Sequence, residues 1–112
     1  MKILNLSQIP DEPVVHNPAI LKRVMLRAGE LPHLTNFSQS RFGPGHLAPA
    51  HSHADMCEVF LVESGNGVIR IDGTEYPMTP GTCVAVAVGE IHEIENTGTE
   101  DLVLTYFGIR AP

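Results

Sequence analysis

Short apolar runs alternate with turn-forming residues along almost the whole chain. No stretch sustains the 3.6-residue apolar period of an amphipathic helix, whereas several runs alternate apolar and polar positions as half-buried strands do. Glycine and proline, with ten and nine residues, are spread between these runs as turn signals. The pattern predicts an all-β sandwich or barrel of roughly eight or nine short strands, with no helix of note.

The expected strands cover residues 3–6, 19–27, 34–42, 57–63, 68–72, 74–78, 82–88, 91–96 and 102–109. Turns are expected at Ser64–Gly67, where the residues suit a hairpin, and at Asp72–Gly73, Thr79–Gly81 and Asn96–Gly98. Gly65 and Gly67 are expected to adopt positive φ angles, and Gly89 to let the chain turn tightly before His92.

Residues 1–18 differ from the rest because Pro10, Pro13 and Pro18 leave no room for a helix longer than a turn. We expect an N-terminal arm (residues 1–18) that packs on the outside of a barrel domain (residues 19–112) or on a neighbouring subunit. Residues 19–27 mix apolar and basic side chains, which suits an exposed or edge strand. The arm and this strand together favour a homodimer.

Composition and charge narrow the class of protein. The 112 residues suit one domain, and the net charge of −6, with seven unclustered Lys and Arg, disfavours nucleic-acid binding. No apolar run reaches the ~20 residues of a membrane helix, and the N-terminus lacks the pattern of a signal peptide. We therefore expect a cytoplasmic protein with free thiols, Cys57 turned outward and Cys83 in the core.

Four residues of metal-ligand type stand close together or on strand-like runs: His51, His53, Glu58 and His92. His51 and His53 are two apart and share a face of a strand, but Glu58 is five beyond His53, so a bend or bulge must lie between them. Asp55, which has the parity of the two histidines, is a rival ligand. Three imidazoles and a carboxylate suit one divalent transition metal (Mn, Fe, Ni, Co, Cu or Zn) rather than Ca²⁺ or Mg²⁺.

These residues also carry a family resemblance. Gly45–Gly65 reads G-x5-H-x-H-x4-E-x6-G, and Gly81–Asn96 reads G-x5-A-x-G-x2-H-x3-N. The two stretches resemble the two motifs of the cupins, in particular small single-domain cupins of the Cupin_2 type, with Ala87 where the family usually has proline. The resemblance implies a double-stranded β-helix, or jelly-roll, barrel and makes Glu58 rather than Asp55 the fourth ligand.

Several further residues are candidates for the pocket. His46 and Tyr106 are candidates for a catalytic acid or base, and the pocket is expected to include Gln39, Phe60, Val62, Leu104 and Tyr106. Parity alone leaves open whether Gln39 or Ser38 faces the pocket. Arg70 either clamps a substrate carboxylate or, as surface arginines more often do, pairs with Asp72 or Glu75.

The chemistry of the site defines two functional hypotheses. Four protein ligands on a six-coordinate ion leave positions open, which is typical of a reactive site. The first hypothesis is therefore a metal-dependent enzyme acting on a small polar molecule, for which the resemblance implies an oxygenase (dioxygenase-like), isomerase, lyase or decarboxylase. The alternative is a non-catalytic module that binds a metal and a small, sugar-type ligand.

Overall fold

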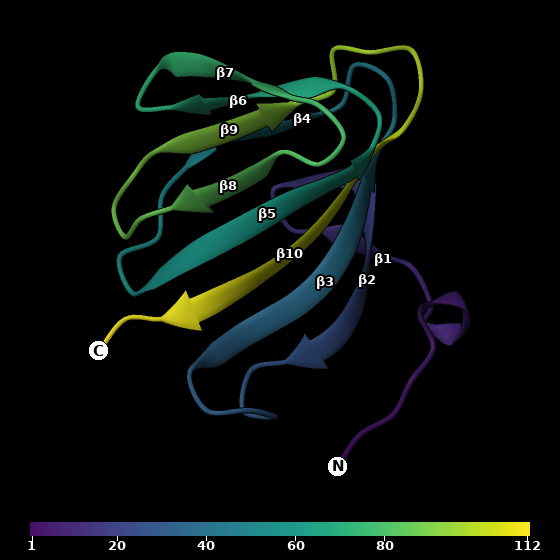
Figure 1. The fold of residues 1–112 in the computed structure, drawn as a ribbon, viewed down its shortest axis with the longest axis vertical. Coiled ribbons are helices and arrows are strands. Elements are labelled where there is room, and N and C mark those ends of the chain that lie inside the picture. Colours follow the sequence, from purple (N-terminus) through teal and green to yellow (C-terminus); the bar gives the residue numbers. More distant parts are fainter.

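The computed structural model describes residues 1–112 and contains ten strands and one short 3-10 turn, η1 (Leu6–Gln8) (Figure 1). All strand pairs are antiparallel, and the strands form two sheets. The larger sheet has the order β1 (Glu12–Val14), β2 (Asn17–Arg27), β3 (Leu34–Phe42), β10 (Leu102–Arg110), β5 (Met56–Ser64), β8 (Cys83–Val86). The smaller has the order β4 (Leu47–His51), β9 (His92–Glu95), β6 (Gly67–Ile71), β7 (Thr74–Met78). The predicted jelly-roll barrel is confirmed.

The strands depart from the prediction where proline is present. The predicted strand at residues 3–6 does not form, while β1 and β4, which were not predicted, contain Pro13 and Pro49. Both are edge strands, where a missing N–H leaves no gap in the ladder. Because β1 pairs with β2 as far as Lys22, residues 19–22 do not form an edge, whereas residues 23–27 pair only with β3, as expected for an edge strand.

Six connections pass from one sheet to the other, and two of them bear directly on the expectations from the sequence. Residues 52–55 join β4 of the smaller sheet to β5 of the larger, and Gly65 and Asn66 join β5 to β6 of the smaller. Ser64–Gly67 is therefore a crossover and not the predicted hairpin. Gly65 has a φ of +84°, as expected, but Gly67 lies in β6 without a positive φ. Gly67 is needed for close packing, because a Cβ there would lie 2.5 Å from the carbonyl oxygen of Glu95.

The core lies between the two sheets. It consists of eleven buried hydrophobic residues: Ile20, Phe42, Ala48, Phe60, Val62, Ile69, Met78, Val86, Ile94, Leu102 and Leu104. Inward residues alternate with outward ones, so that Val84 and Val86 of β8 face the core while Cys83 is exposed. The expectation of a buried Cys83 was wrong, because its neighbour Val84 takes the inward position and Cys83 therefore points outward. No helix in the structure has the length and apolar character needed to cross a membrane.

The N-terminal segment lies against the outside of β2 and β3. Asp11 pairs with Arg23 at 3.2 Å and with Arg41 at 2.8 Å, and Lys2 pairs with Glu30 at 2.6 Å. The guanidinium of Arg41, followed by that of Arg23, holds the pKa of the Asp11 carboxyl below its ordinary value. These contacts fasten the segment to the barrel of the same chain.

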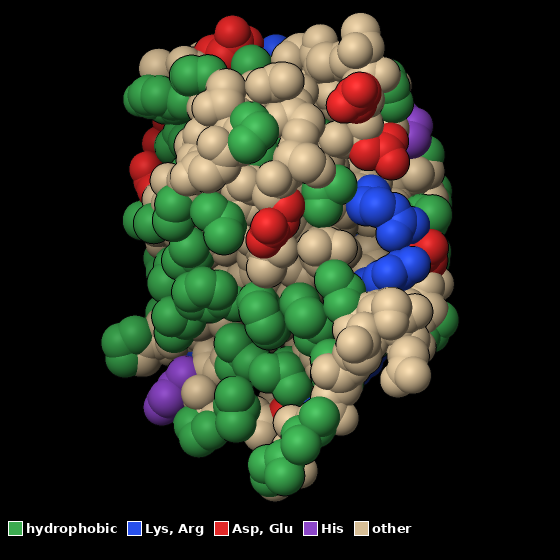
Figure 2. Space-filling view, turned by 45° about the vertical axis from the view of Figure 1, so that its right-hand side comes forward, with side chains coloured by type: hydrophobic (Ala, Val, Ile, Leu, Met, Phe, Trp, Pro, Cys, Tyr) green, Lys and Arg blue, Asp and Glu red, His purple; other side chains and the backbone are tan.

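The outer face of the larger sheet carries an apolar row. The registers place five residues side by side across five strands, and we call them the outer apolar row: Leu26, Phe37, Phe107, Val59 and Ala85. Directly paired residues share a face, and the neighbours of these residues along each strand point inward. Hydrophobic side chains gather on the lower half of the surface in Figure 2. This row is unusual, because the open face of an antiparallel sheet is normally polar.

The crossover glycine provides a test of the fold. Gly65 and Gly73 have the same φ of +84°, but a Cβ on Gly65 would collide with the Asp101 carbonyl oxygen, while a Cβ on Gly73 would meet nothing within 4 Å. We expect Gly73→Ala to lower the free energy of unfolding by ~1–2 kcal/mol through backbone strain alone. Gly65→Ala should cost a further ~1–3 kcal/mol because of the clash. Urea unfolding of both variants measures the difference, and equal losses would show that the crossover tolerates a side chain.

Candidate metal centre

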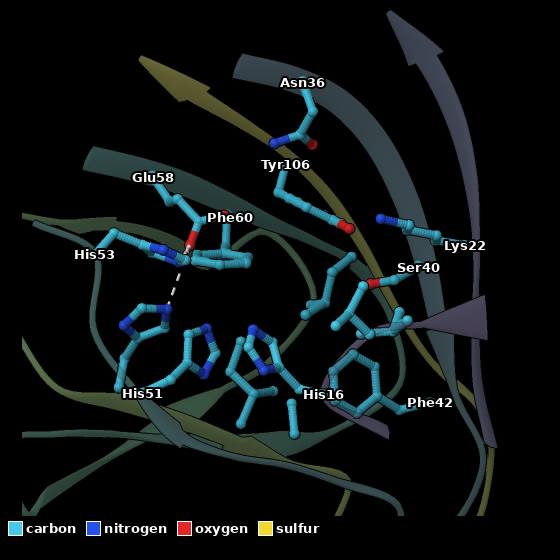
Figure 3. A pocket seen from close by; sticks show the side chains of 16 residues that line it. His16, Lys22, Asn36, Ser40, Phe42, His51, His53, Glu58, Phe60 and Tyr106 are labelled. Atoms are coloured by element: carbon cyan, nitrogen blue, oxygen red, sulfur yellow. Dashed lines mark ion pairs between the residues drawn. The ribbon is translucent and has the colours of Figure 1, made fainter. Parts of the chain in front are cut away.

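Four side chains from four parts of the fold converge on one point inside the barrel. The ligand atoms of His51, His53, Glu58 and His92 all lie within 4.8 Å of one another. His51 ends β4 and is paired with His92 at the start of β9, while Glu58 approaches from β5 of the opposite sheet. His53 lies in the connection between β4 and β5. Figure 3 shows His51, His53 and Glu58 directed toward a common point.

The crossover after β4 explains how Glu58 joins the histidines. The sequence required a bend or bulge between His53 and Glu58, and the structure places there a complete change of sheet at residues 52–55. Asp55 lies in this connection with its side chain 72% exposed, 3.8 Å from Arg110. It therefore does not belong to the cluster, because strand parity does not continue through a connection between sheets.

Backbone carbonyls orient two of the imidazoles. His51 Nδ1 lies 2.8 Å from the carbonyl oxygen of Pro49, and His92 Nδ1 lies 3.2 Å from that of Glu90. A carbonyl can only accept, so each Nδ1 must carry the proton and donate it. The lone pair of each ring is then on Nε2, on the side of the cluster. This arrangement of an outer hydrogen bond and an inner lone pair is typical of histidines that bind a metal.

The inner atoms lack suitable partners among themselves. His92 Nε2 is buried and makes no hydrogen bond, and the oxygen near it, Glu58 Oε1 at 3.3 Å, carries a lone pair as Nε2 does. Glu58 Oε1 also lies 3.0 Å from His53 Nε2. A buried polar atom without a partner costs free energy, and a cation between these atoms would remove that cost. The residues therefore fit a divalent transition metal held by three nitrogens and one carboxylate.

The pKa shifts of Glu58 and His51 are suited to binding a cation, whereas that of His92 opposes it. Burial raises the pKa of Glu58, but the closeness of His92 and the charge on His53 outweigh it, so the net pKa is below the ordinary value. Burial lowers the pKa of His51, which keeps that ring neutral. Burial also lowers the pKa of His92, but the nearby Glu58 carboxylate reverses the shift and raises it. A metal would compete with this last proton, since ligand imidazoles bind in the neutral form.

A cavity of about 180 Å³ extends from the cluster into the barrel. Its apolar wall includes Phe60 and Leu104, as expected, and Tyr106 also lines it. Burial raises the pKa of Tyr106 to about 12, and the charge of Glu58 adds to this, so the hydroxyl stays protonated at neutral pH.

Three expected residues lie elsewhere. Gln39 is on the outer face of β3, because the inward set of that strand is Asn36, Ser38 and Ser40. Val62 is 2% exposed and packs in the core without lining the cavity. His46 lies outside the cavity, where its Nδ1 accepts a hydrogen bond from the Gly43 N–H at 3.0 Å. The expectation that Gln39 and Val62 line the pocket is therefore wrong. His46, the candidate acid or base, does not line the cavity either.

Two ionisable residues of the cavity were not identified from the sequence. His16 stacks on His51 with 4.1 Å between ring centroids, and Lys22 lies on the opposite wall. His16 was missed because it follows β1, a strand hidden by Pro13. Lys22 could have been found, because it shares strand parity with Ile20, the fully buried residue of β2.

Arg70 does not face the cavity. It pairs with Glu93 at 2.6 Å, Glu95 at 2.8 Å and Glu75 at 3.1 Å. The pairing with Glu75 agrees with one of the two sequence alternatives, and Asp72 instead accepts a hydrogen bond from the Ile91 N–H at 2.9 Å. Arg70 thus links the outer faces of neighbouring strands and does not clamp a ligand.

The turn before His92 is fixed in a way that proline would not allow. The Ala87 N–H donates to Glu90 Oε1 at 2.7 Å, and the Glu90 N–H donates to the Ala87 carbonyl oxygen at 3.2 Å. Gly89 completes the turn with a φ of +82°. Proline has no N–H and could not donate this hydrogen bond. With Ala87 in place of the usual proline, the bond to Glu90 restrains the turn instead of the proline ring.

The two sheets, the four-residue cluster and the adjoining cavity define a cupin. The family model of the cupin domain matches residues 39–108, more than half of the chain, and the protein belongs to the cupin family.

Individual relatives carry different descriptions. The chain is 33% identical to an oxalate-binding protein of Thermotoga maritima over 66 residues, which are 59% of this chain and 54% of that protein. The matched stretch thus spans about half of that relative's length. A structure described as a predicted oxalate decarboxylase of Thermotoga maritima is similar with a TM-score of 0.91 at 23% identity, covering 98% of this chain and 100% of the other. A putative sugar phosphate isomerase of Acidithiobacillus ferrooxidans has a TM-score of 0.79 at 28% identity, covering 97% and 75%.

Removing a ligand tests the metal centre. We expect protein purified without added metal to carry a divalent transition metal, and His51→Ala and His92→Ala to lose it. The loss in affinity should exceed the ~10–100-fold typical of removing an outer hydrogen-bond partner, because a direct ligand is deleted. Elemental analysis by mass spectrometry gives the metal content. His46→Ala is the matched control, since that imidazole lies outside the cavity, and equal metal content in all three variants would contradict the assignment.

Proposed function

We propose that the protein is a mononuclear, divalent-metal-dependent enzyme that acts on a small polar molecule, with oxygenase-like or isomerase-like chemistry. One observation carries the proposal: the four candidate ligands line a cavity of about 180 Å³ whose wall also presents the polar side chains of Lys22, Ser40 and Tyr106. A closed structural site would have no such adjoining space. The volume suits a small molecule, being close to the ~150 Å³ of a cavity that holds benzene.

The roles of the residues follow from their positions. A metal in the cluster would polarise a substrate oxygen or activate dioxygen. Tyr106, with its raised pKa, offers a neutral hydroxyl that can donate a hydrogen bond or a proton to the substrate. Phe60, stacked on Tyr106 at 5.4 Å and near His92 at 6.2 Å, forms the apolar wall that excludes water from the reacting atoms.

The relatives support a small polar substrate, but they do not favour any single reaction. One is described as binding oxalate and another as a putative sugar phosphate isomerase. Both compounds present oxygen atoms that a cupin metal could bind. The reaction type therefore has to be found by experiment, beginning with small carboxylic acids and phosphosugars.

A binding module without turnover is the second candidate. The relative of 33% identity is described as binding oxalate. Apart from the cluster, His16 is the only imidazole lining the cavity, and it is stacked on His51. Because this imidazole is stacked on a candidate metal ligand, the cavity has few side chains that could act as a general acid or base.

Turnover assays separate the two candidates. We expect the metal-loaded protein to convert at least one member of a panel of small carboxylic acids and phosphosugars, followed by NMR and with an oxygen electrode. Tyr106→Phe should lower kcat by ~10²–10⁴-fold, the range for a general acid or base, with a much smaller change in binding. Val103→Ala, on the outer side of the same strand, is the control. Saturable binding without product for the whole panel would favour the binding module.

The cellular setting is part of the proposal. Cys57 and Cys83 are both free, which supports a reducing cytoplasm. All five arginines pair with carboxylates, so they leave no basic stripe for a nucleic acid.

We also propose that the protein forms a homodimer through the outer apolar row. An apolar row on an open sheet face marks an interaction surface. The row carries no charged residue, so two copies of a chain with a net charge of −6 can meet there without direct repulsion. Residues 1–18, expected to contact a partner, would lie beside this interface, since Asp11 fastens them to β2 and β3.

A charged substitution beside the row tests the dimer. Leu61 is 40% exposed and lies next to Val59 along β5 on the same outer face, while Tyr76 is 49% exposed on β7 of the other sheet. We expect wild type and Tyr76→Glu to have twice the 12.2 kDa chain mass by light scattering, and Leu61→Glu to be monomeric at micromolar concentration. A monomeric wild type would contradict the proposal.

A further inference from the structure

We propose that the cavity selects a short aliphatic dicarboxylate, with one carboxylate at the metal cluster and the other at Lys22. This inference deepens the proposed function and rests on it for the metal-bound end. The second anionic end is assigned from Lys22, a residue that neither the cupin motifs nor the family match, residues 39–108, includes.

Lys22 is the one cationic side chain without an anionic partner. Lys2 and all five arginines form ion pairs with carboxylates. Lys22 forms none, although it lines the cavity and is partly buried. Glu12 is its direct partner in the ladder between β1 and β2, but the Glu12 carboxylate is bound by Arg27 at 2.8 Å. A partly buried ammonium without a counter-ion favours binding of an anion.

Hydrogen-bond donors surround the end of Lys22. Figure 3 shows its amino group directed toward the hydroxyl of Tyr106, with Ser40 close by. Both residues line the cavity. The raised pKa of Tyr106 keeps this hydroxyl available as a donor. An ammonium and two hydroxyls converging from β2, β3 and β10 suit the two oxygens of a carboxylate.

Apolar side chains lie between the two ends of the cavity, which His16 and Asn36 also line. Phe60 lies between the histidine cluster and Lys22 in Figure 3, and Phe42, Ile94 and Leu104 also line the cavity. A ligand charged in the middle would lose its hydration there without compensation. A dicarboxylate with methylene groups between its two carboxylates has the same order of polar, apolar and polar parts as the cavity. Its charged ends would lie at the metal cluster and at Lys22, and its methylene groups against the apolar wall.

The size of the cavity limits the length of this chain. About 180 Å³ accommodates a molecule slightly larger than benzene, which occupies a cavity of ~150 Å³. Dicarboxylates of roughly four or five carbons, such as succinate and glutarate, agree with this volume. Oxalate has no methylene group, so it would occupy the metal end without reaching Lys22.

Binding measurements with two lysine variants test the assignment. Lys22→Met removes the proposed anchor, and Lys2→Met is the matched control because it removes the same charge from the only other lysine, outside the cavity. Oxalate, malonate, succinate and glutarate are titrated calorimetrically into metal-loaded and metal-free protein. Thermal unfolding and metal analysis of each variant show that fold and metal content are retained.

We expect Lys22→Met to weaken succinate or glutarate binding by about 10- to 100-fold, as for the loss of a charge-assisted hydrogen bond. Oxalate binding to the loaded protein should change less than ~3-fold, and Lys2→Met should change neither. Equal effects of Lys22→Met on oxalate and on the longer acids, or no effect on either, would overturn the inference.

The metal-free protein separates this inference from the proposed function. If the cluster does not hold a metal, weak binding of succinate will still depend on Lys22 but will not increase on adding metal. If instead metal strengthens binding of every acid and Lys22→Met changes none of them, the metal centre stands and the dicarboxylate anchor is wrong.

Discussion

The passage of the chain from one sheet to the other, between His51 and Met56, is the constraint on which the site depends. His51 and His92 are neighbours within the smaller sheet, whereas Glu58 belongs to the larger one. The carboxylate therefore meets the imidazoles only when the two sheets face each other. The buried core between the sheets fixes their separation, and a close-packed core allows little adjustment of it. Formation of the metal centre and closure of the barrel are thus parts of one cooperative event.

One wall of the cavity depends on surface contacts of the N-terminal segment. His16 reaches the cavity from the end of β1, which pairs with β2, and this pairing is supported by the ion pairs of Asp11 with Arg23 and Arg41. Each exposed ion pair contributes little by itself. Together with the ladder, however, they hold a wall of the cavity that the core does not reach. The two packed sheets thus hold the four candidate ligands, while the wall beside His51 rests on a short edge strand.

The sequence predicted those features that follow from a repeating pattern. Strand parity and turn residues located eight strands, and ligand spacing identified His51, His53, Glu58 and His92, which the structure brings together. Parity could not choose between Gln39 and Ser38, because both faces of β3 mix polar and apolar side chains and only the fold decides which is inward. His16 was beyond reach for another reason: its contact with His51 joins residues from different sheets, and no local pattern encodes such a distance.

The family match begins at residue 39, after both His16 and Lys22. All four candidate metal ligands lie within it, whereas the unpaired ammonium of the cavity lies before it. The candidate metal ligands and the proposed anchor for a second carboxylate therefore lie in different portions of the chain. Substitutions in β1 and β2 can then alter the anion that the cavity accepts without replacing a candidate metal ligand. Such a barrel can diversify in its ligand through strands at one margin of the larger sheet, as long as the core residue Ile20 of β2 is kept.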